Sequence, residues 1–120
     1  MNIQYVAGFL DGEGCFYVSP SGSFTIGVTS TYPRTLFELA EAYGGSVNVK
    51  KQKVGRPAFQ WRVHGRLAIE LADEIVDHLQ EKKEQAELIL TLYNVTAKGT
   101  ALRDQLVTEL KAMKRIHHAL

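Results

Sequence analysis

The sequence predicts an α+β fold in which an antiparallel four-stranded sheet carries helices on one face. The 120-residue chain is long enough for one domain with its own core, and 45% of it is hydrophobic. Amphipathic helical segments alternate with two pairs of short runs in which apolar and polar residues alternate. One set of strand side chains is polar, which is typical of a sheet with one open face. We therefore expect one domain over residues 1–120 with the order α-ββ-α-ββ-α-α-α.

The first predicted helix carries the segment VAGFLDGEG, residues 6–14. Gly8 and Gly12 lie four residues apart and share one side of a helix, where each costs about 1 kcal/mol relative to Ala. Small residues let two helices approach closely. The segment therefore predicts that a second helix packs closely against Ala7, Gly8 and Gly12.

Two carboxylates flank the second glycine. Asp11 and Glu13 lie near the C-terminus of the helix, where they meet the negative pole of its dipole. A bound divalent cation would relieve that repulsion. The alternative is a helix that ends at Gly14 as a C-cap residue, with both carboxylates merely solvated.

The next segment predicts a hairpin with strands over residues 15–19 and 23–30 around the turn Pro20-Ser21-Gly22. Alternate strand residues are expected to point to opposite faces of the sheet. The apolar set is Phe16, Val18, Phe24, Ile26 and Val28; the other set is Cys15, Tyr17, Ser19, Ser23, Thr25, Gly27 and Thr29.

A second helix and a second hairpin follow. Pro33 fits the first helical turn, and Gly44-Gly45 ends the helix. The strands are expected over residues 46–53 and 58–64, around Val54-Gly55-Arg56-Pro57. Their inner face is Val47, Val49, Phe59, Trp61 and Val63, and their outer face is Asn48, Lys50, Gln52, Gln60, Arg62 and His64.

Three further helices complete the predicted order. Apolar residues at helical spacing mark one helix between Leu67 and Leu79 and another between Ala86 and Tyr93. Thr100 can cap a last helix over residues 100–118, whose role the sequence leaves open.

The outer sheet face predicts a nucleic-acid surface. Arg and Lys pair with guanine edges in the DNA major groove, and Gln or Asn with adenine, and this face offers such residues. The candidate DNA-binding residues are Tyr17, Ser19, Ser23, Thr25, Asn48, Lys50, Gln52, Gln60, Arg62 and His64. The alternative is an ordinary solvated sheet surface. The net charge of +1 does not itself indicate a nucleic-acid partner.

Other classes of function are disfavoured. A single cysteine, Cys15, forms no internal disulfide and has no zinc-site spacing around it. No apolar run approaches the roughly 20 residues that span a bilayer, and no signal peptide is evident. We expect an intracellular protein with no membrane partner, in the cytoplasm or nucleoid of a prokaryotic or phage-infected host or in an organelle.

Residues 8–14 also lack the lysine and glycine spacing of a phosphate-binding loop, so no nucleotide cofactor is expected.

The segment VAGFLDGEG resembles the signature of the LAGLIDADG homing endonucleases. The predicted αββαββα order, Trp61-Arg62-Val63 and Lys82-Lys83-Glu84-Gln85-Ala86 are similar to single-motif members of that family over most of the chain. The resemblance implies a homodimer that cleaves both strands of DNA at a long, near-palindromic site and serves intron or intein mobility. It also implies Mg²⁺ (or Mn²⁺) as the cofactor.

The resemblance further implies the roles of individual residues. Glu13 corresponds to the metal-binding acid, with the Gly12 carbonyl as a second metal ligand, although the family more commonly has Asp at the position of Glu13. Lys82 corresponds to the lysine that polarises the solvent, with Lys83 as the neighbouring choice. Ser30 corresponds to a polar residue, often Gln or Asn, that ends the second strand. The implied dimer interface is Ala7, Gly8, Asp11 and Gly12.

Two alternatives remain open from the sequence. A non-cleaving nucleic-acid binder of the same fold, such as an intron maturase or a repressor, would keep the polar sheet face. A helix-mediated dimerisation module would explain the glycines but neither the acids nor the polar face. The presence of Glu13 favours the enzyme.

Overall fold

The computed structural model describes residues 1–19, 22–50, 55–95 and 108–112. Its four strands are β1 (Cys15–Val18), β2 (Phe24–Ser30), β3 (Ser46–Lys50) and β4 (Ala58–His64). They form one antiparallel sheet in the order β1-β2-β4-β3. The helices are α1 (Ile3–Glu13), α2 (Arg34–Tyr43), α3 (Gly65–Ile75) and α4 (Lys83–Val95), with a 3₁₀ turn η1 (Val76–His78) between the last two. The expected αββαββα order and the α+β class are confirmed.

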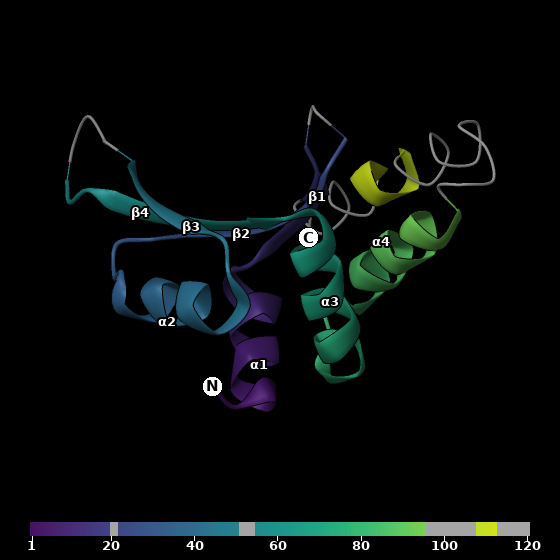
Figure 1. Cartoon of the computed structure of the whole chain (residues 1–120), viewed down its shortest axis with the longest axis horizontal. Coiled ribbons are helices and arrows are strands. Elements are labelled where there is room, and N and C mark those ends of the chain that lie inside the picture. Colours follow the sequence, from purple (N-terminus) through teal and green to yellow (C-terminus); the bar gives the residue numbers. More distant parts are fainter. Residues whose placement is uncertain (20–21, 51–54, 96–107, 113–120) are drawn as a thin grey trace.

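Helices α1, α2 and α3 lie on one side of the sheet, and α4 packs beside α3 (Figure 1). The hydrophobic core fills the space between these layers and includes Trp61 and Phe16 from the sheet and Leu10 and Leu36 from the helices. The opposite face of the sheet carries no helix along β3 and β4 in the described part of the chain (Figure 1).

Local chemistry sets the bounds of α1. The Asn2 side chain accepts hydrogen bonds from the backbone N–H groups of Gln4 and Tyr5, at 2.8 and 3.2 Å, as an N-cap residue does. At the other end, the N–H of Gly14 donates to the Leu10 carbonyl at 2.9 Å. The chain then enters β1 directly, so the end of α1 lies beside the beginning of the sheet.

Several bounds differ from the expected ones. Pro33 caps α2 and does not lie within its first turn, and the helix predicted up to Leu79 ends at Ile75 and continues as η1. The strand β1 ends one residue early, at Val18, and β2 begins one residue late, at Phe24. Residues 20–21, 51–54, 96–107 and 113–120, including much of the last predicted helix, lie outside the described residues; residues 108–112 are helical.

The turn between α2 and β3 requires glycine at position 45. Gly45 has a φ of +88°, and a Cβ atom there would lie 2.3 Å from the backbone oxygen of Arg62. The neighbouring Gly44 carbonyl accepts a hydrogen bond from the buried Trp61 indole at 3.0 Å. The close approach of this turn to β4 therefore anchors α2 against the sheet.

We expect Gly45→Ala to lower the free energy of unfolding by at least about 2 kcal/mol, because it adds a backbone clash to an unfavourable φ. Chemical denaturation monitored by Trp61 fluorescence measures the loss. Gly55→Ala is the matched control, since Gly55 has a φ of +91° but open space where a Cβ atom would lie. Equal losses in the two variants would contradict the role assigned to the close approach.

Candidate functional site

Glu13 and Ser30 lie in one pocket at the end of α1. This pocket, of about 410 Å³, is lined by Phe9, Glu13, Ser30, Tyr32 and Thr35. Glu13 is the last residue of α1 and is exposed, and Ser30 is the last residue of β2. The Ser30 hydroxyl accepts a hydrogen bond from the N–H of Tyr32 at 3.1 Å, which turns the chain away from the strand. Two residues 17 positions apart in the sequence are thus brought together.

Hydrogen bonds of Asp11 connect the end of α1 to the segment that precedes α4. Its carboxylate accepts hydrogen bonds from three successive backbone N–H groups, those of Gln80 at 3.2 Å, Glu81 at 3.1 Å and Lys82 at 2.8 Å. The Lys82 ammonium in turn donates to the backbone carbonyl of Asp11. A cation at this carbonyl also complements the negative pole of the α1 dipole. We call this arrangement the Asp11–Lys82 latch.

The two lysines singled out in the sequence are placed differently. The Lys82 side chain reaches the end of α1, two residues from Glu13, whereas Lys83 begins α4. The Asp11 carboxylate is engaged within its own chain, and its expected place in a dimer interface stays a prediction. The hydrogen bonds of the latch could not be predicted from local sequence patterns, because Asp11 and its partners lie 69 to 71 residues apart in the sequence.

We expect Asp11→Ala to lower the free energy of unfolding by about 1–3 kcal/mol, because three backbone N–H groups lose a charged acceptor. Thermal or chemical denaturation measures this change. Asp73→Ala serves as the control, since Asp73 is an exposed carboxylate on α3, away from the latch. A similar loss in both variants would mean that the latch adds nothing to stability.

The exposed side of α1 presents the two motif glycines. Gly8 and Gly12 are exposed, and a Cβ atom added at either would meet nothing within 4 Å. Tyr5 and Phe9 stack along the same helix with ring centroids 6.3 Å apart, and Tyr5 is 53% exposed. Ala7, in contrast, is fully buried in the chain's own core, so the expectation that its side chain lies in a dimer interface is wrong.

The outer face of the sheet carries the expected polar residues in register. Asn48, Gln60 and Thr29 lie opposite one another across three strands, as do Ser46, Arg62 and Gly27. The Arg62 guanidinium donates to the Gln60 side-chain oxygen at 2.6 Å, which fixes the two side chains relative to each other. The exposed members of the predicted DNA-binding set are Asn48, Lys50, Arg62 and His64.

Other members of that set are placed differently. Thr25 lies opposite His64 on the expected face, but the prediction that it is open to a ligand there is wrong, because its side chain is fully buried. Ser19 and Ser23 close the first hairpin, with the Ser19 hydroxyl accepting from the Ser23 N–H at 3.1 Å, and Tyr17 is half-buried. Gln52 lies outside the described residues.

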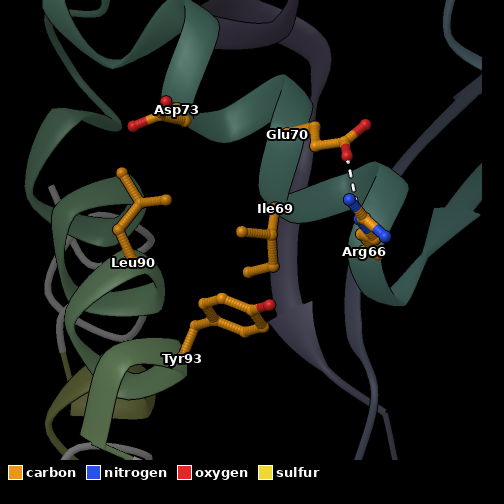
Figure 2. Close-up of a pocket in the computed structure, with 6 residues that line it drawn as sticks. All are labelled: Arg66, Ile69, Glu70, Asp73, Leu90 and Tyr93. Carbon is orange, nitrogen blue, oxygen red and sulfur yellow. Dashed lines mark hydrogen bonds and ion pairs between the residues drawn. The ribbon is translucent and has the colours of Figure 1, made fainter.

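A second pocket lies between α3 and α4 (Figure 2). It measures about 350 Å³ and is lined by Arg66, Ile69, Glu70, Asp73, Leu90 and Tyr93. The Arg66 guanidinium pairs with the Glu70 carboxylate at 3.1 Å. Its lining comes from α3 and α4, so this pocket is separate from the one that contains Glu13.

Within the described part of the chain, no three His, Cys, Asp or Glu side chains are grouped so that they could hold a metal ion. One protomer offers the Glu13 carboxylate and the Gly12 carbonyl at the end of α1. Both are the hard oxygen donors that Mg²⁺ prefers. These residue types therefore fit a divalent cation, although one chain supplies a single carboxylate. The same described residues contain no helix long and apolar enough to cross a membrane.

Solved structures of homing endonucleases share this fold. The chain is 20% identical to I-CvuI in complex with its target in the presence of Ca, with a TM-score of 0.73, covering 92% of this chain and 80% of that one. It is 22% identical to the archaeal intron-encoded I-Vdi141I complexed with DNA, with a TM-score of 0.71, covering 92% and 82%. The chain is also 25% identical to I-SmaMI bound to an uncleaved DNA target in the presence of calcium ions, with a TM-score of 0.62. The match covers 93% of this chain and 44% of I-SmaMI, so this chain spans less than half the length of that protein.

Sequence similarity alone does not connect the chain to a known family. No family model matches the chain, and no curated protein matches it. The resemblance is therefore one of three-dimensional structure together with the short segment VAGFLDGEG.

Proposed function

We propose that this chain, which has the fold of the LAGLIDADG homing endonucleases, is a site-specific DNA endonuclease that acts as a homodimer. The observation that carries the proposal is the pocket at the end of α1, where Glu13 and Ser30 come together beside the latch that holds Lys82. An acid, a hydroxyl and a cation at one end of a polar sheet face are the groups that phosphodiester hydrolysis needs.

The homodimer follows from what one chain lacks. A single protomer supplies one Glu13, whereas two chains related by a two-fold axis would supply one Glu13 for each strand of the duplex. The exposed backbone at Gly8 and Gly12 leaves room for a second α1 helix. A two-fold axis along this contact would bring both Glu13 carboxylates to the centre of the dimer.

The proposed cofactor is Mg²⁺ (or Mn²⁺), held by Glu13 and the Gly12 carbonyl. When bound, such a cation supplies an activated water and neutralises charge on the phosphate. The Lys82 ammonium stabilises negative charge that develops near the end of α1. Ser30 offers a hydroxyl that can orient a water in the Glu13 pocket.

The proposed substrate is double-stranded DNA with a long, near-palindromic site. Strands β2 and β4 present Thr29, Gln60 and Arg62 toward the open face, and β3 adds Lys50 and Asn48. The Gln60–Arg62 bond holds the guanidinium in a fixed orientation, which favours paired hydrogen bonds to a guanine edge. An enzyme with this substrate acts inside the cell, and we infer that location.

Selection of cleaved sites from a randomised duplex pool in Mg²⁺ tests the proposal. Recovery of one near-palindromic site, cut on both strands, is the expected result. Site-selective binding without cleavage would instead identify a nucleic-acid binder of the same fold, such as a maturase or repressor. Absence of any selective binding would overturn the proposal.

We expect Arg62→Ala to relax base preference at one symmetric pair of positions, because a side chain that makes two hydrogen bonds to one base contributes about 1–3 kcal/mol of discrimination. A binding profile over all single-base variants of the selected site measures the change. Arg66→Ala is the control, because Arg66 pairs with Glu70 on the helical side. Identical profiles for Arg62→Ala and the wild type would favour an ordinary solvated sheet surface.

A further inference from the structure

His64 forms a hydrogen bond with a buried hydroxyl on the outer side of the sheet. It lies directly opposite Thr25 in the β2–β4 register. The Thr25 Oγ1 atom and the His64 Nδ1 atom are 3.0 Å apart. Thr25 is fully buried, whereas His64 is exposed. One nitrogen of the imidazole is thus fixed against the protein, and the rest of the ring extends toward solvent.

The direction of this hydrogen bond follows from the number of protons available. The Thr25 hydroxyl also contacts the Ser23 backbone carbonyl, at 3.3 Å. A carbonyl oxygen only accepts, so the single hydroxyl proton of Thr25 is directed to Ser23. With its proton directed to the Ser23 carbonyl, which also accepts from the Ser19 N–H at 2.8 Å, the Thr25 oxygen accepts from His64 in the tautomer that carries a proton on Nδ1. The buried hydroxyl is satisfied both as donor and as acceptor in this arrangement.

A neutral imidazole with a proton on Nδ1 has a bare lone pair on Nε2. His64 is an exposed residue of the outer sheet face. We propose that Thr25 locks His64 in this tautomer, so that Nε2 acts as a hydrogen-bond acceptor on the DNA-facing surface. In the major groove, the donors available to an acceptor are the amino groups of adenine and cytosine. His64 therefore selects adenine or cytosine on the strand that it contacts.

This inference rests on the proposed function, because it takes the outer sheet face to lie in the major groove. It adds a specificity-determining residue and assigns Thr25 a positioning role. The two residues act as a unit: Thr25 touches no base, yet it decides whether His64 presents an acceptor or a donor.

The tautomer is measured first, on the full-length protein without DNA. The ¹⁵N chemical shifts of imidazole nitrogens distinguish a protonated from a bare nitrogen, and weakly alkaline buffer favours the neutral ring. The chain has four histidines, so the spectrum of His64→Gln assigns the His64 signals by their disappearance. We expect a protonated Nδ1 and a bare Nε2 in the wild type. A protonated Nε2 would overturn the inference.

Base preference is measured next, as a binding profile over single-base variants of the selected site. The wild type is expected to prefer adenine or cytosine at one symmetric pair of positions. His64→Ala should reduce that preference about 2- to 10-fold, the range of one neutral hydrogen bond. Thr25→Val, which removes the hydroxyl, should reduce it similarly and give a mixed tautomer in the spectrum.

Two further variants keep the experiment decisive. Thr25→Ser retains the hydroxyl and should retain both the tautomer and the base preference, even if the valine variant fails to fold. Thr91→Val removes an exposed hydroxyl from α4, which is not part of the proposed DNA-binding face, and should leave the base preference at the His64 position unchanged. A wild type and a His64→Ala variant with identical profiles would overturn this inference alone. A wild type that selects no DNA site would overturn the proposed function as well.

Discussion

Glu13→Gln is expected to lower the rate of DNA cleavage by several orders of magnitude while leaving DNA binding close to that of the wild type. The substitution keeps the size and hydrogen-bonding capacity of the side chain but removes the charge that would hold a divalent cation. Glu13 is exposed at the end of α1, so the fold does not depend on its carboxylate. Single-turnover cleavage in Mg²⁺ and binding without metal measure the two effects separately.

Glu87→Gln provides the matched control for this experiment. Glu87 is an exposed carboxylate on α4, outside the pocket that contains Glu13. Its substitution should leave both cleavage and binding unchanged. Cleavage at the wild-type rate in Glu13→Gln would show that Glu13 takes no part in the mechanism. Loss of DNA binding together with cleavage would show that Glu13 is a recognition residue.

Gly8→Leu should convert the proposed dimer into monomers and thereby abolish cleavage. In the single chain, a side chain at position 8 meets open space, so the folded protomer accommodates leucine. In the dimer, the added side chain would separate two helices whose backbones must approach closely. Sedimentation velocity reports the oligomeric state, and circular dichroism verifies that the helical content is retained.

The control for Gly8→Leu is Glu87→Leu, which adds the same side chain to an exposed face of another helix. That variant should remain dimeric and active. A dimer that survives Gly8→Leu would place the protomer contact elsewhere on the surface.

The order of helices and strands could be predicted from the sequence because each element carries its own local signal. Alternation of apolar and polar residues located β4, and apolar residues at helical spacing located α3. The same alternation placed Thr25 on the face that it shares with His64, but it did not predict that the Thr25 side chain is buried. Residues 24–28 of β2 are all buried, since this central strand is covered on both faces. Strand periodicity reports which residues share a face, but not how much of that face other segments cover.

The candidate site was only partly predictable. Glu13 was proposed because glycine spacing and a carboxylate lie within nine consecutive residues, and Ser30 was proposed only through the family resemblance. Tyr32 and Thr35 line the same pocket but carry no distinctive local pattern. Their place depends on where the chain turns after β2, which is set by a hydrogen bond between Ser30 and Tyr32.

The Asp11–Lys82 latch limits how the chain can change length. The segment between η1 and α4 is short and largely exposed, and such connections usually tolerate inserted residues. Here three consecutive amide groups must reach one carboxylate, so even a single inserted residue would break the match. The exposed connection between η1 and α4 is thus fixed in length. Domain fusions to this protein are better introduced at another surface segment.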